Sequence, residues 1–428
     1  MSTRTKPTIR QRLQKISTFI FKIILHAILV VVCGVLVYLN IRLYYSPVYV
    51  GSANQAVHHQ LNHLKTVLHS GGGKRAQAQY PEGFVFMNAL YGLTWADFIQ
   101  DLPTSDPIRI TGLEEINWVL KELDSKYAQM HFPYELNPQR GIFYLGWKNY
   151  LLGKKLILQS PKERSSEEYE QFKKQCQSIY NAYQVSEKTY LESYKKLAWP
   201  ADNMVGVASL ALYNHLDTAI YESFIRTWLL GVQEKLDTGT GLIPHEVNFE
   251  TQGVLEGAKG SSQSLMLNFL IDLDPVFAKK QFEKYRTQFL DYRFGLPGIR
   301  EYPKGTKGGE DVDSGPVLLG IGGSASLVGQ RTMALYEEIE IAVGLRNCIE
   351  SFGAAYTSDN EKIYVLGLEP IADAFIAWSN VVSIQNTEKQ VGNWRWAFQL
   401  LSLILVLPIL IFYKKKGTKF LNFIKNKK

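Results

Sequence analysis

The sequence predicts an all-α protein, an (α/α)₆ barrel or toroid of helical hairpins, with a membrane-spanning helix before it and another after it. Between residues 84 and 390, apolar residues recur at spacings of three and four, and runs of alternating β-branched residues are nearly absent. The pattern repeats in roughly ten to twelve segments joined by Gly, Pro, Asp and Asn. A four-helix bundle would need far fewer residues, and a superhelical array would show a fixed sequence period that this chain lacks.

The first element after a basic tail of residues 1–22 is an apolar run at residues 23–41, IILHAILVVVCGVLVYLNI. It contains no Lys, Arg, Asp or Glu and is long enough to cross the hydrocarbon core of a bilayer as a helix. A cleaved signal peptide is the alternative, but bulky residues follow where a cleavage site needs small ones. Residues 396–413, WAFQLLSLILVLPILIFY, form a second uncharged run. The lipid bilayer is therefore an expected partner.

The two ends of the chain are basic. Residues 1–22 carry six basic residues and residues 414–428 carry seven, and neither segment contains an acidic residue. The positive-inside rule then predicts that both ends are cytoplasmic and that residues 84–390 form a periplasmic domain on the outer side of the cytoplasmic membrane. Because the rest of the chain holds all 40 acidic residues, it is net acidic, and a nucleic-acid partner is not expected.

Residues 42–83 are expected to form a juxtamembrane segment containing one helix. The three cysteines, Cys33, Cys176 and Cys348, lie far apart in the sequence. Cys176 and Cys348 are either buried thiols or a disulfide pair, and sequence does not distinguish the two. No CxxC motif or Cys/His cluster is present, so the sequence predicts no metal and no other cofactor.

Three segments carry candidate functional residues ahead of residue 300. In AWPADNMVGVASLAL, Asp202 and Asn203 either cap a helix or face a substrate at its start. In GTGLIPHEVNFETQG, His245 and Glu246 combine an imidazole that titrates near neutral pH with a carboxylate, which suits an acid/base pair or a substrate clamp. In GIFYLGWKNYLLGKK, Tyr144 and Trp147 either stack on a substrate or belong to the core.

The segment GLPGIREYPKGTKGGEDVDSGP has the strongest chemical signal. It begins with Arg300, Glu301 and Tyr302 and ends in a glycine-flanked loop with three carboxylates, those of Glu310, Asp311 and Asp313. Neighbouring carboxylates in a partly desolvated cleft raise one another's pKa, which yields the protonated acid and the ionised base that acid/base catalysis uses. Calcium is the competing interpretation, but the offsets of an EF-hand loop are not met.

Residues 91 to about 340 resemble the linalool dehydratase-isomerase family. The resemblance lies in WPADN, RTWLLGVQEKL, IDLDPVFAKKQFEKYRTQF, and IRE followed by GGEDVDSGPVLLG. It implies an (α/α)₆ barrel and a lyase or isomerase activity on a terpenoid alcohol. Two cysteines that flank the family's Asp-Asn motif fall on Trp199 and Ala208, its active-site tyrosine on Ser261 and its active-site histidine on Trp147. This exchange of Cys and Tyr for Trp and Ser favours a more polar, hydroxylated substrate.

The sequence therefore predicts a membrane-anchored enzyme that makes or breaks a C–O bond of an envelope glycan, a glycolipid or a similar substrate by acid/base catalysis, as glycoside hydrolases do. A lyase or isomerase acting on a membrane-derived alcohol is the first alternative, and a non-catalytic barrel that binds a glycan or a protein is the second. The predicted catalytic residues are Asp202, Glu310, Asp311 and Asp313. The predicted substrate-binding residues are Tyr144, Trp147, Asn203, His245, Glu246, Ser261, Arg300, Glu301 and Tyr302. The oligomeric state is not predicted.

Overall fold

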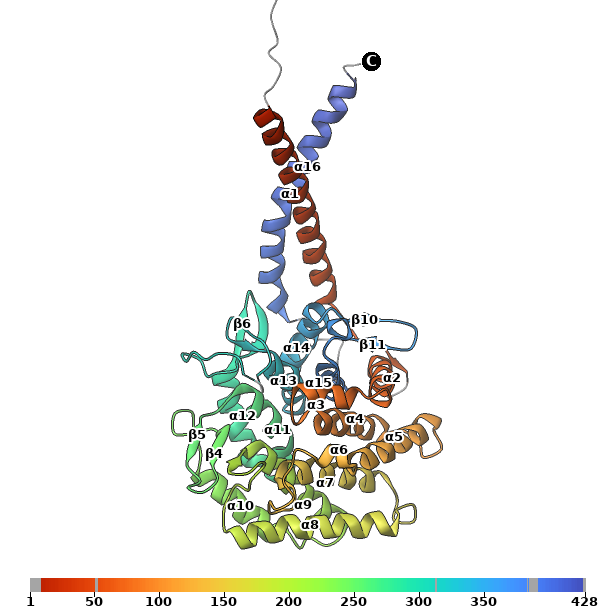
Figure 1. Ribbon diagram of the computed structural model, residues 1–428, viewed down its shortest axis with the longest axis vertical. Helices are drawn as coiled ribbons and strands as arrows, with labels where there is room; N and C mark the ends of the chain where they lie inside the picture. Colours follow the sequence, from red (N-terminus) through yellow and green to blue (C-terminus); the bar gives the residue numbers. More distant parts are fainter. Residues whose placement is uncertain (1–8, 51–52, 312–313, 383, 385–391, 426–428) are drawn as a thin grey trace, which may run out of the picture.

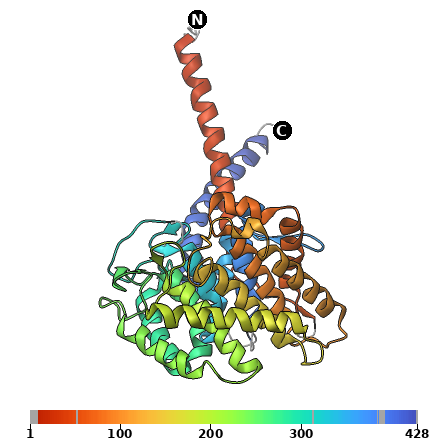
Figure 2. The same cartoon turned by 60° about the horizontal axis from the view of Figure 1, so that its bottom comes forward.

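The computed structural model of the chain describes residues 9–50, 53–311, 314–382, 384 and 392–425 (Figure 1). The described chain is mostly helical and its strands are short, as the hydrophobic periodicity predicted. Two long helices extend together from one side of a domain that contains the remaining elements (Figures 1 and 2).

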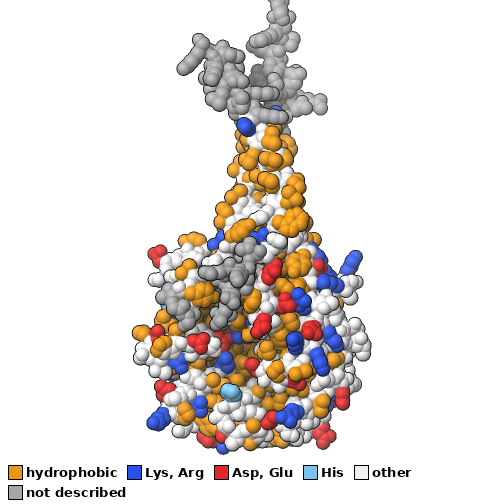
Figure 3. All heavy atoms as spheres, turned by 180° about the vertical axis from the view of Figure 1, so that it is seen from behind, with side chains coloured by type: hydrophobic (Ala, Val, Ile, Leu, Met, Phe, Trp, Pro, Cys, Tyr) orange, Lys and Arg blue, Asp and Glu red, His pale blue; other side chains and the backbone are white. Residues whose placement is uncertain are grey.

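The two projecting helices are α1 (Ile9–Arg42) and α16 (Trp396–Lys425). Within them, Ser17–Arg42 and Asn393–Lys414 are long and apolar enough to cross a membrane, which agrees with the two spans predicted from the sequence. Their described surfaces are almost entirely apolar (Figure 3). The helices contact each other, and the amide of Asn40 donates to the hydroxyl of Ser402 at 2.9 Å. Such a bond between apolar helices favours one register of their pairing.

Six helices of the described chain form a closed series of contacts. Each one packs against the next, and the last packs against the first. In chain order they are α4 (Gly83–Ile99), α7 (Gly141–Leu158), α9 (Pro200–Leu216), α11 (Gly260–Leu273), α13 (Gly323–Leu335) and α15 (Pro370–Asn380). Most of their residues are buried all round, so these helices contribute much of the core.

The other helices of the domain pack against members of this series. Helix α2 contacts α4 and α15, α5 contacts α4 and α7, α8 contacts α7 and α9, α10 contacts α9, α12 contacts α11, and α14 contacts α13. Their bounds are Gln55–His69 for α2, Pro107–Leu123 for α5, Ser166–Ser186 for α8, Glu222–Glu234 for α10, Pro275–Phe289 for α12 and Ile339–Phe352 for α14. Two shorter helices, α3 (Gly72–Gln79) and α6 (Lys126–Gln129), lie between them in the chain.

The helix starts follow from local chemistry. Asp274 caps α12 by accepting hydrogen bonds from the backbone N–H groups of Val276 and Phe277, both at 2.9 Å, and Pro275 occupies the first helical position. Asp106 and Pro107 begin α5 in the same way. These caps satisfy backbone donors that have no partner inside the helix.

The short strands lie in the connections between helices, and all their pairings are antiparallel. They are β1 (Tyr49–Val50) with β2 (Ala53–Asn54), β3 (Leu197–Ala198) with β4 (Glu246–Asn248) and β5 (Val254–Glu256), β6 (Leu290–Arg293) with β7 (Leu296–Ile299), β8 (Val317–Leu318) with β9 (Ile321–Gly322), and β10 (Tyr356–Thr357) with β11 (Lys362–Ile363). Two short 3₁₀ helices, η1 (Val365–Gly367) and η3 (Asn393–Arg395), complete the described elements. Strand β4 begins directly after His245, and β7 ends two residues before Glu301. These small sheets therefore fix the positions of two candidate functional residues.

The closest helix packing is between α7 and α9. A Cβ atom placed on Gly146 would lie 3.1 Å from the backbone of Gly206, and one placed on Gly206 would lie 2.5 Å from the side chain of Ile142. Only glycine therefore lets the two helices approach this closely.

All three cysteines are free thiols, and Cys176 is buried under α9 beside Asn149.

Replacing Gly146 by Val should lower the thermal unfolding midpoint of the detergent-solubilised protein by several degrees. The added methyl groups would force α7 and α9 apart, and overpacking of this kind costs about 1–3 kcal/mol. Circular dichroism at 222 nm measures the midpoint. The matched control is Gly309→Val, because nothing lies within 4 Å of a Cβ atom there. Equal midpoints for Gly146→Val and the wild type would contradict the close approach.

Candidate active site

Glu301 lies at the centre of a polar cluster beside the start of α11. Its backbone is held on both sides, since its carbonyl accepts from the N–H of Gly260 at 2.8 Å and its N–H donates to the carbonyl of Gly320 at 3.2 Å. The side chain is fully buried. Its Oε1 accepts a hydrogen bond from the Ser261 hydroxyl at 2.6 Å, and its Oε2 has no hydrogen-bond partner among the described residues.

The surroundings of Glu301 raise its pKa into the neutral range. Burial raises the pKa of the Glu301 carboxyl to about 7, the hydrogen bond from Ser261 opposes the rise, and the negative charge of Asp311 adds to it. His245 and Lys259 act in the opposite direction from nearby. A carboxyl group with this pKa can release or accept a proton at physiological pH, which an ordinary glutamate does poorly.

Lys259, directly before α11, connects two further carboxylates. Its ammonium group is buried and lies 2.7 Å from Glu256 Oε1, and it donates a hydrogen bond to Asp311 Oδ2. Burial alone would lower the pKa of Lys259, but Asp311 and Glu256 outweigh burial and raise it. Lys259 is therefore a permanent positive charge beside the Glu301 carboxyl.

Asp311 is the ionised partner of the cluster. Burial alone would raise the pKa of Asp311, but hydrogen bonds from Lys259 and from the backbone N–H of Ser314 lower it below its usual range. About a third of the Asp311 side chain is exposed. Two carboxyl groups with oppositely shifted pKa values thus act on each other, one buried and neutral and the other accessible and charged.

His245 joins the same cluster from the hairpin formed by β4 and β5. Its Nδ1 is hydrogen-bonded to the Ser262 hydroxyl, and its Nε2 lies 3.7 Å from Glu256 Oε2. The backbone N–H of His245 donates to the carbonyl of Glu256 at 3.1 Å, so the hairpin itself sets the distance between the two side chains. The imidazole therefore lies between a serine hydroxyl and a carboxylate.

Several residues predicted from the sequence meet in this cluster. Ser261, His245, Glu301 and Asp311 lie there, and the Tyr302 ring stands 5.9 Å from the Lys259 ammonium. Glu310 is exposed on the adjoining loop, and Asp313 lies outside the described residues. Among the described residues, no group of three or more His, Cys, Asp or Glu side chains could hold a metal ion.

Asp202 and Asn203 occupy the first turn of α9, the helix that packs against α11. Neither is the cap residue, which is Trp199. Asp202 is buried and accepts a hydrogen bond from the Ser193 hydroxyl. Asn203 accepts from Tyr183 and from the N–H of Leu191, and its amide donates to two carbonyl groups. This saturation leaves no donor or acceptor of Asn203 for a ligand and argues against a substrate-binding role.

Four other predicted residues have structural contacts. The Tyr144 hydroxyl donates to the carbonyl of Leu123 at 2.6 Å, and Trp147 is fully buried against Phe86 and Phe269. Arg300 turns away from Glu301 and pairs with Asp291 at 3.1 Å. Glu246 lies in β4, paired in register with Glu256. The contacts of Tyr144 and Trp147 are those of core residues.

Sequence reasoning missed Lys259, Glu256 and Ser262. They lie in the segment EGAKGSSQS, where single polar residues without a motif give no chemical signal. The change from a glycine-rich loop to an apolar helix was the available signal, because it marks the start of α11 and hence the position of Ser261.

A shallow surface groove between α10 and α12 shares no residue with this cluster.

A comparison with models of known protein families finds no match to this chain, and no curated protein is similar to it. The resemblance to the linalool dehydratase-isomerase family therefore stays a proposal.

Replacing Glu301 by Gln should raise the free energy of unfolding, relative to that of the wild type, more at pH 8 than at pH 5. The folded pKa of about 7 lies above the ordinary value of 4.5, so the folded state binds more protons than the unfolded state between these values. The wild-type free energy of unfolding then falls as the pH rises from about 4.5 to about 7, by up to about 3 kcal/mol, and the Gln variant cannot show this fall. Thermal unfolding midpoints of both proteins from pH 4.5 to 8 measure the difference. Glu310→Gln, an exposed neighbour, is the control, and parallel pH profiles for Glu301→Gln and the wild type would refute a buried neutral Glu301.

Proposed function

We propose that this protein is a membrane-anchored enzyme that makes or breaks a C–O bond of a hydroxylated substrate, such as an envelope glycan or glycolipid, by general acid/base catalysis. The observation that carries the proposal is the buried Glu301 carboxyl, which is hydrogen-bonded to Ser261, has a pKa of about 7 and lies close to the ionised Asp311. Polar and aromatic groups around it, those of His245, Lys259 and Tyr302, support a polar rather than a hydrocarbon substrate.

In the proposed mechanism, Glu301 is the general acid. The Ser261 hydroxyl is only partly buried, so it can reach a substrate that the fully buried Glu301 cannot. For this step the hydrogen bond between the two side chains reverses, so that the protonated Glu301 Oε1 donates to Ser261 Oγ and the Ser261 hydroxyl turns to the substrate. Glu301 then gives its proton to Ser261 Oγ as the Ser261 hydroxyl proton moves to the leaving oxygen, and the C–O bond breaks. Asp311 accepts a proton from the attacking water. The positive charge of Lys259 stabilises the negative charge that develops on Glu301 as it loses its proton.

We propose that the closed series of helix contacts is an (α/α)₆ barrel, with α4, α7, α9, α11, α13 and α15 as its inner ring and α2, α5, α8, α10, α12 and α14 as its outer ring. The contact of α15 with α4 supports closure, and the resemblance to the linalool dehydratase-isomerase family supports the same fold. Ser261 and Asp202 lie in the first turns of two adjacent inner helices. The site would therefore occupy the barrel end where the inner helices begin.

The second candidate is a lyase or isomerase that acts on a terpenoid or another membrane-derived alcohol. The complete burial of Glu301 favours it, because dehydration needs a proton donor in a site that excludes water. The same residues would serve, with the leaving oxygen departing as water and Asp311 taking a proton from carbon instead of from a nucleophilic water. A full-length preparation screened against envelope glycans and terpenoid alcohols separates the two candidates.

Glu301→Gln and Asp311→Asn should each lower kcat on the substrate found in that screen by about 10²-fold or more, because each removes a proton-transfer step. Glu310→Gln, on the same loop, should retain activity. Retained binding with lost turnover is expected for Glu301→Gln. If both variants turned over at wild-type rates, the acid/base assignment would be wrong.

The pH dependence of kcat should have its alkaline limb near pH 7. The reaction needs Glu301 protonated, and the protonated fraction falls as the pH rises through about 7. Asp311 must be ionised, and its lowered pKa keeps it so down to below its ordinary value of 3.8. Initial rates from pH 4 to 9 should therefore be highest on the acidic side of neutrality, and a rate that rises through pH 7 to 9 would contradict the role of Glu301.

We also propose that both chain ends are cytoplasmic and that the domain lies on the outer side of the membrane. The basic ends and the departure of α1 and α16 from the same side of the domain support this topology. A membrane-impermeant maleimide should label Gly309→Cys in intact cells and should not label Ser2→Cys until the membrane is opened. Gly309 is exposed, so absence of label there would reverse the topology.

A further inference from the structure

The junction between the two projecting helices and the domain contains a second polar cluster. It lies where α1 ends at Arg42 and where η3 leads into α16. A small apolar cluster of Leu43, Leu296, Trp394 and Phe398 packs there, separate from the main core of the domain. The polar groups around it come from α1, α14, β11 and η3.

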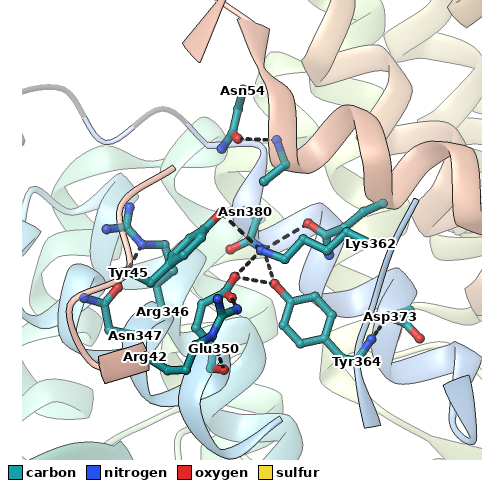
Figure 4. Close-up of polar contacts among 12 residues, drawn as sticks. Arg42, Tyr45, Asn54, Arg346, Asn347, Glu350, Lys362, Tyr364, Asp373 and Asn380 are labelled. Atoms are coloured by element: carbon teal, nitrogen blue, oxygen red, sulfur yellow. Dashed lines mark hydrogen bonds and ion pairs between the residues drawn. The ribbon is translucent and has the colours of Figure 1, made fainter. Parts of the chain in front are cut away.

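Glu350 is the central acid of this junction (Figure 4). It is fully buried on α14 and forms ion pairs with the equally buried Lys362 and with Arg42 at the end of α1. The Tyr364 hydroxyl donates to it at 2.6 Å. One carboxylate thus faces two cations, which leaves one positive charge without compensation.

Two further arginines at the junction are buried without an acid. Arg346 and Arg395 are each 6% exposed. Within the described part of the chain, neither has a carboxylate within ion-pair distance, since the junction acid Glu350 pairs with Arg42 and Lys362 instead. The Nη1 of Arg395 has no hydrogen-bond acceptor there, although it is buried.

The contacts that these arginines do have are neutral. Arg395 Nε donates to the carbonyl of Leu43 at 2.8 Å, and Arg346 Nε donates to the side-chain oxygen of Asn347 at 3.2 Å. The Arg395 guanidinium lies over the rings of Trp394 and Tyr44, at 4.0 Å and 4.9 Å from their centroids. These contacts orient both guanidinium groups but do not neutralise them. Among the described residues, the acids that act on them, Glu350 on Arg346 and Glu340 on Arg395, do so without forming an ion pair.

Among the described residues, the other acids near the junction do not supply the missing charge. Glu340 is exposed and acts on Arg395 only over a longer distance. Asp373 accepts from the backbone N–H of Tyr364, and burial raises the pKa of Asp373 to about 7, so it carries little charge below neutral pH. Arginine does not lose its proton in proteins, and a buried unpaired cation is strongly unfavourable. A bound anion would remove this cost.

The position of the two arginines indicates the source of the anion. The candidate spans end at Arg42 and begin at Asn393, so both guanidinium groups lie at the level of the lipid headgroups if the helices cross a bilayer as proposed. Tyr44 and Trp396 are exposed at the same level, where aromatic side chains favour the membrane interface. Arginine pairs with phosphate oxygens through two parallel hydrogen bonds.

We propose that Arg346 and Arg395 bind the phosphate group of an anionic phospholipid at the junction. The lipid headgroup would lie between α14 and η3, and its acyl chains would run along α1 and α16. This site is distinct from the Glu301 cluster and rests on the proposed membrane anchoring, not on the proposed reaction. Loss of catalysis in Glu301 variants would therefore leave lipid binding unchanged.

Native mass spectrometry of the full-length protein in detergent tests the proposal with phosphatidylglycerol, phosphatidylcholine of the same chains, and inorganic phosphate as probes. The wild type should bind one phosphatidylglycerol in preference to phosphatidylcholine, and millimolar inorganic phosphate should not displace it. Arg346→Gln combined with Arg395→Gln should weaken this binding about tenfold or more, because two charge-assisted hydrogen-bonding groups are lost. Arg226→Gln, at an exposed arginine of α10, should bind as the wild type does.

Each result decides the proposal. Unchanged phosphatidylglycerol affinity in the double variant, or equal binding of phosphatidylcholine, would overturn it. Displacement by inorganic phosphate would assign the site to a free anion and overturn the lipid assignment. If the double variant does not fold, Arg395→Lys keeps the charge without the paired hydrogen bonds. It should bind at least about threefold more weakly, and unchanged affinity would overturn the proposal in the same way.

Discussion

The burial of the Glu301 carboxyl is the constraint on which the candidate site depends. It requires the start of α11 and the end of β9 to close tightly on the segment that contains Glu301, and two glycines allow this closure. A Cβ atom on Gly260 would lie 1.9 Å from the carbonyl oxygen of Arg300, and one on Gly322 would lie 2.7 Å from Glu301 Oε2. The raised pKa of Glu301 thus originates mainly in the burial that this packing imposes, and the negative charge of Asp311 adds to it.

The site and the junction respond to burial in opposite ways. At Glu301 a single acid without an ion pair can become neutral by holding a proton, and the raised pKa is the result. At the junction, Arg346 and Arg395 cannot become neutral at any physiological pH, so burial there demands an anion. The same desolvation therefore supports the proposed proton transfer in one place and the proposed lipid binding in the other.

The local sequence pattern, meaning the spacing of apolar residues, the uncharged runs and the polar loops, predicted the helices, both candidate spans and part of the candidate site. His245, Glu301 and Asp311 were found from residue type and loop context, and Ser261 from the family resemblance. The sequence could not show that Glu301, and not Asp202, is the acid beside the loop, because that depends on which helix starts lie together. It also placed Tyr144 and Trp147 at a pocket, since an aromatic residue near a helix start has the same local pattern whether it faces a ligand or the core. Lys259 was missed because its partners, Glu256 and Asp311, come together only in the folded chain.

The Leu43 carbonyl accepts hydrogen bonds from both Asn347 and Arg395, and Arg42 pairs with Glu350 inside the domain. Only residues 43–48 separate α1 from the first strand of the domain. The projecting helices are therefore part of the folded unit and not a detachable tether. Cutting the chain at these helices would expose the apolar cluster around Trp394 and leave Glu350 with one cation fewer. The packing of these two helices and the folding of the domain are therefore thermodynamically coupled, and a protein truncated to its domain would not have the same native state.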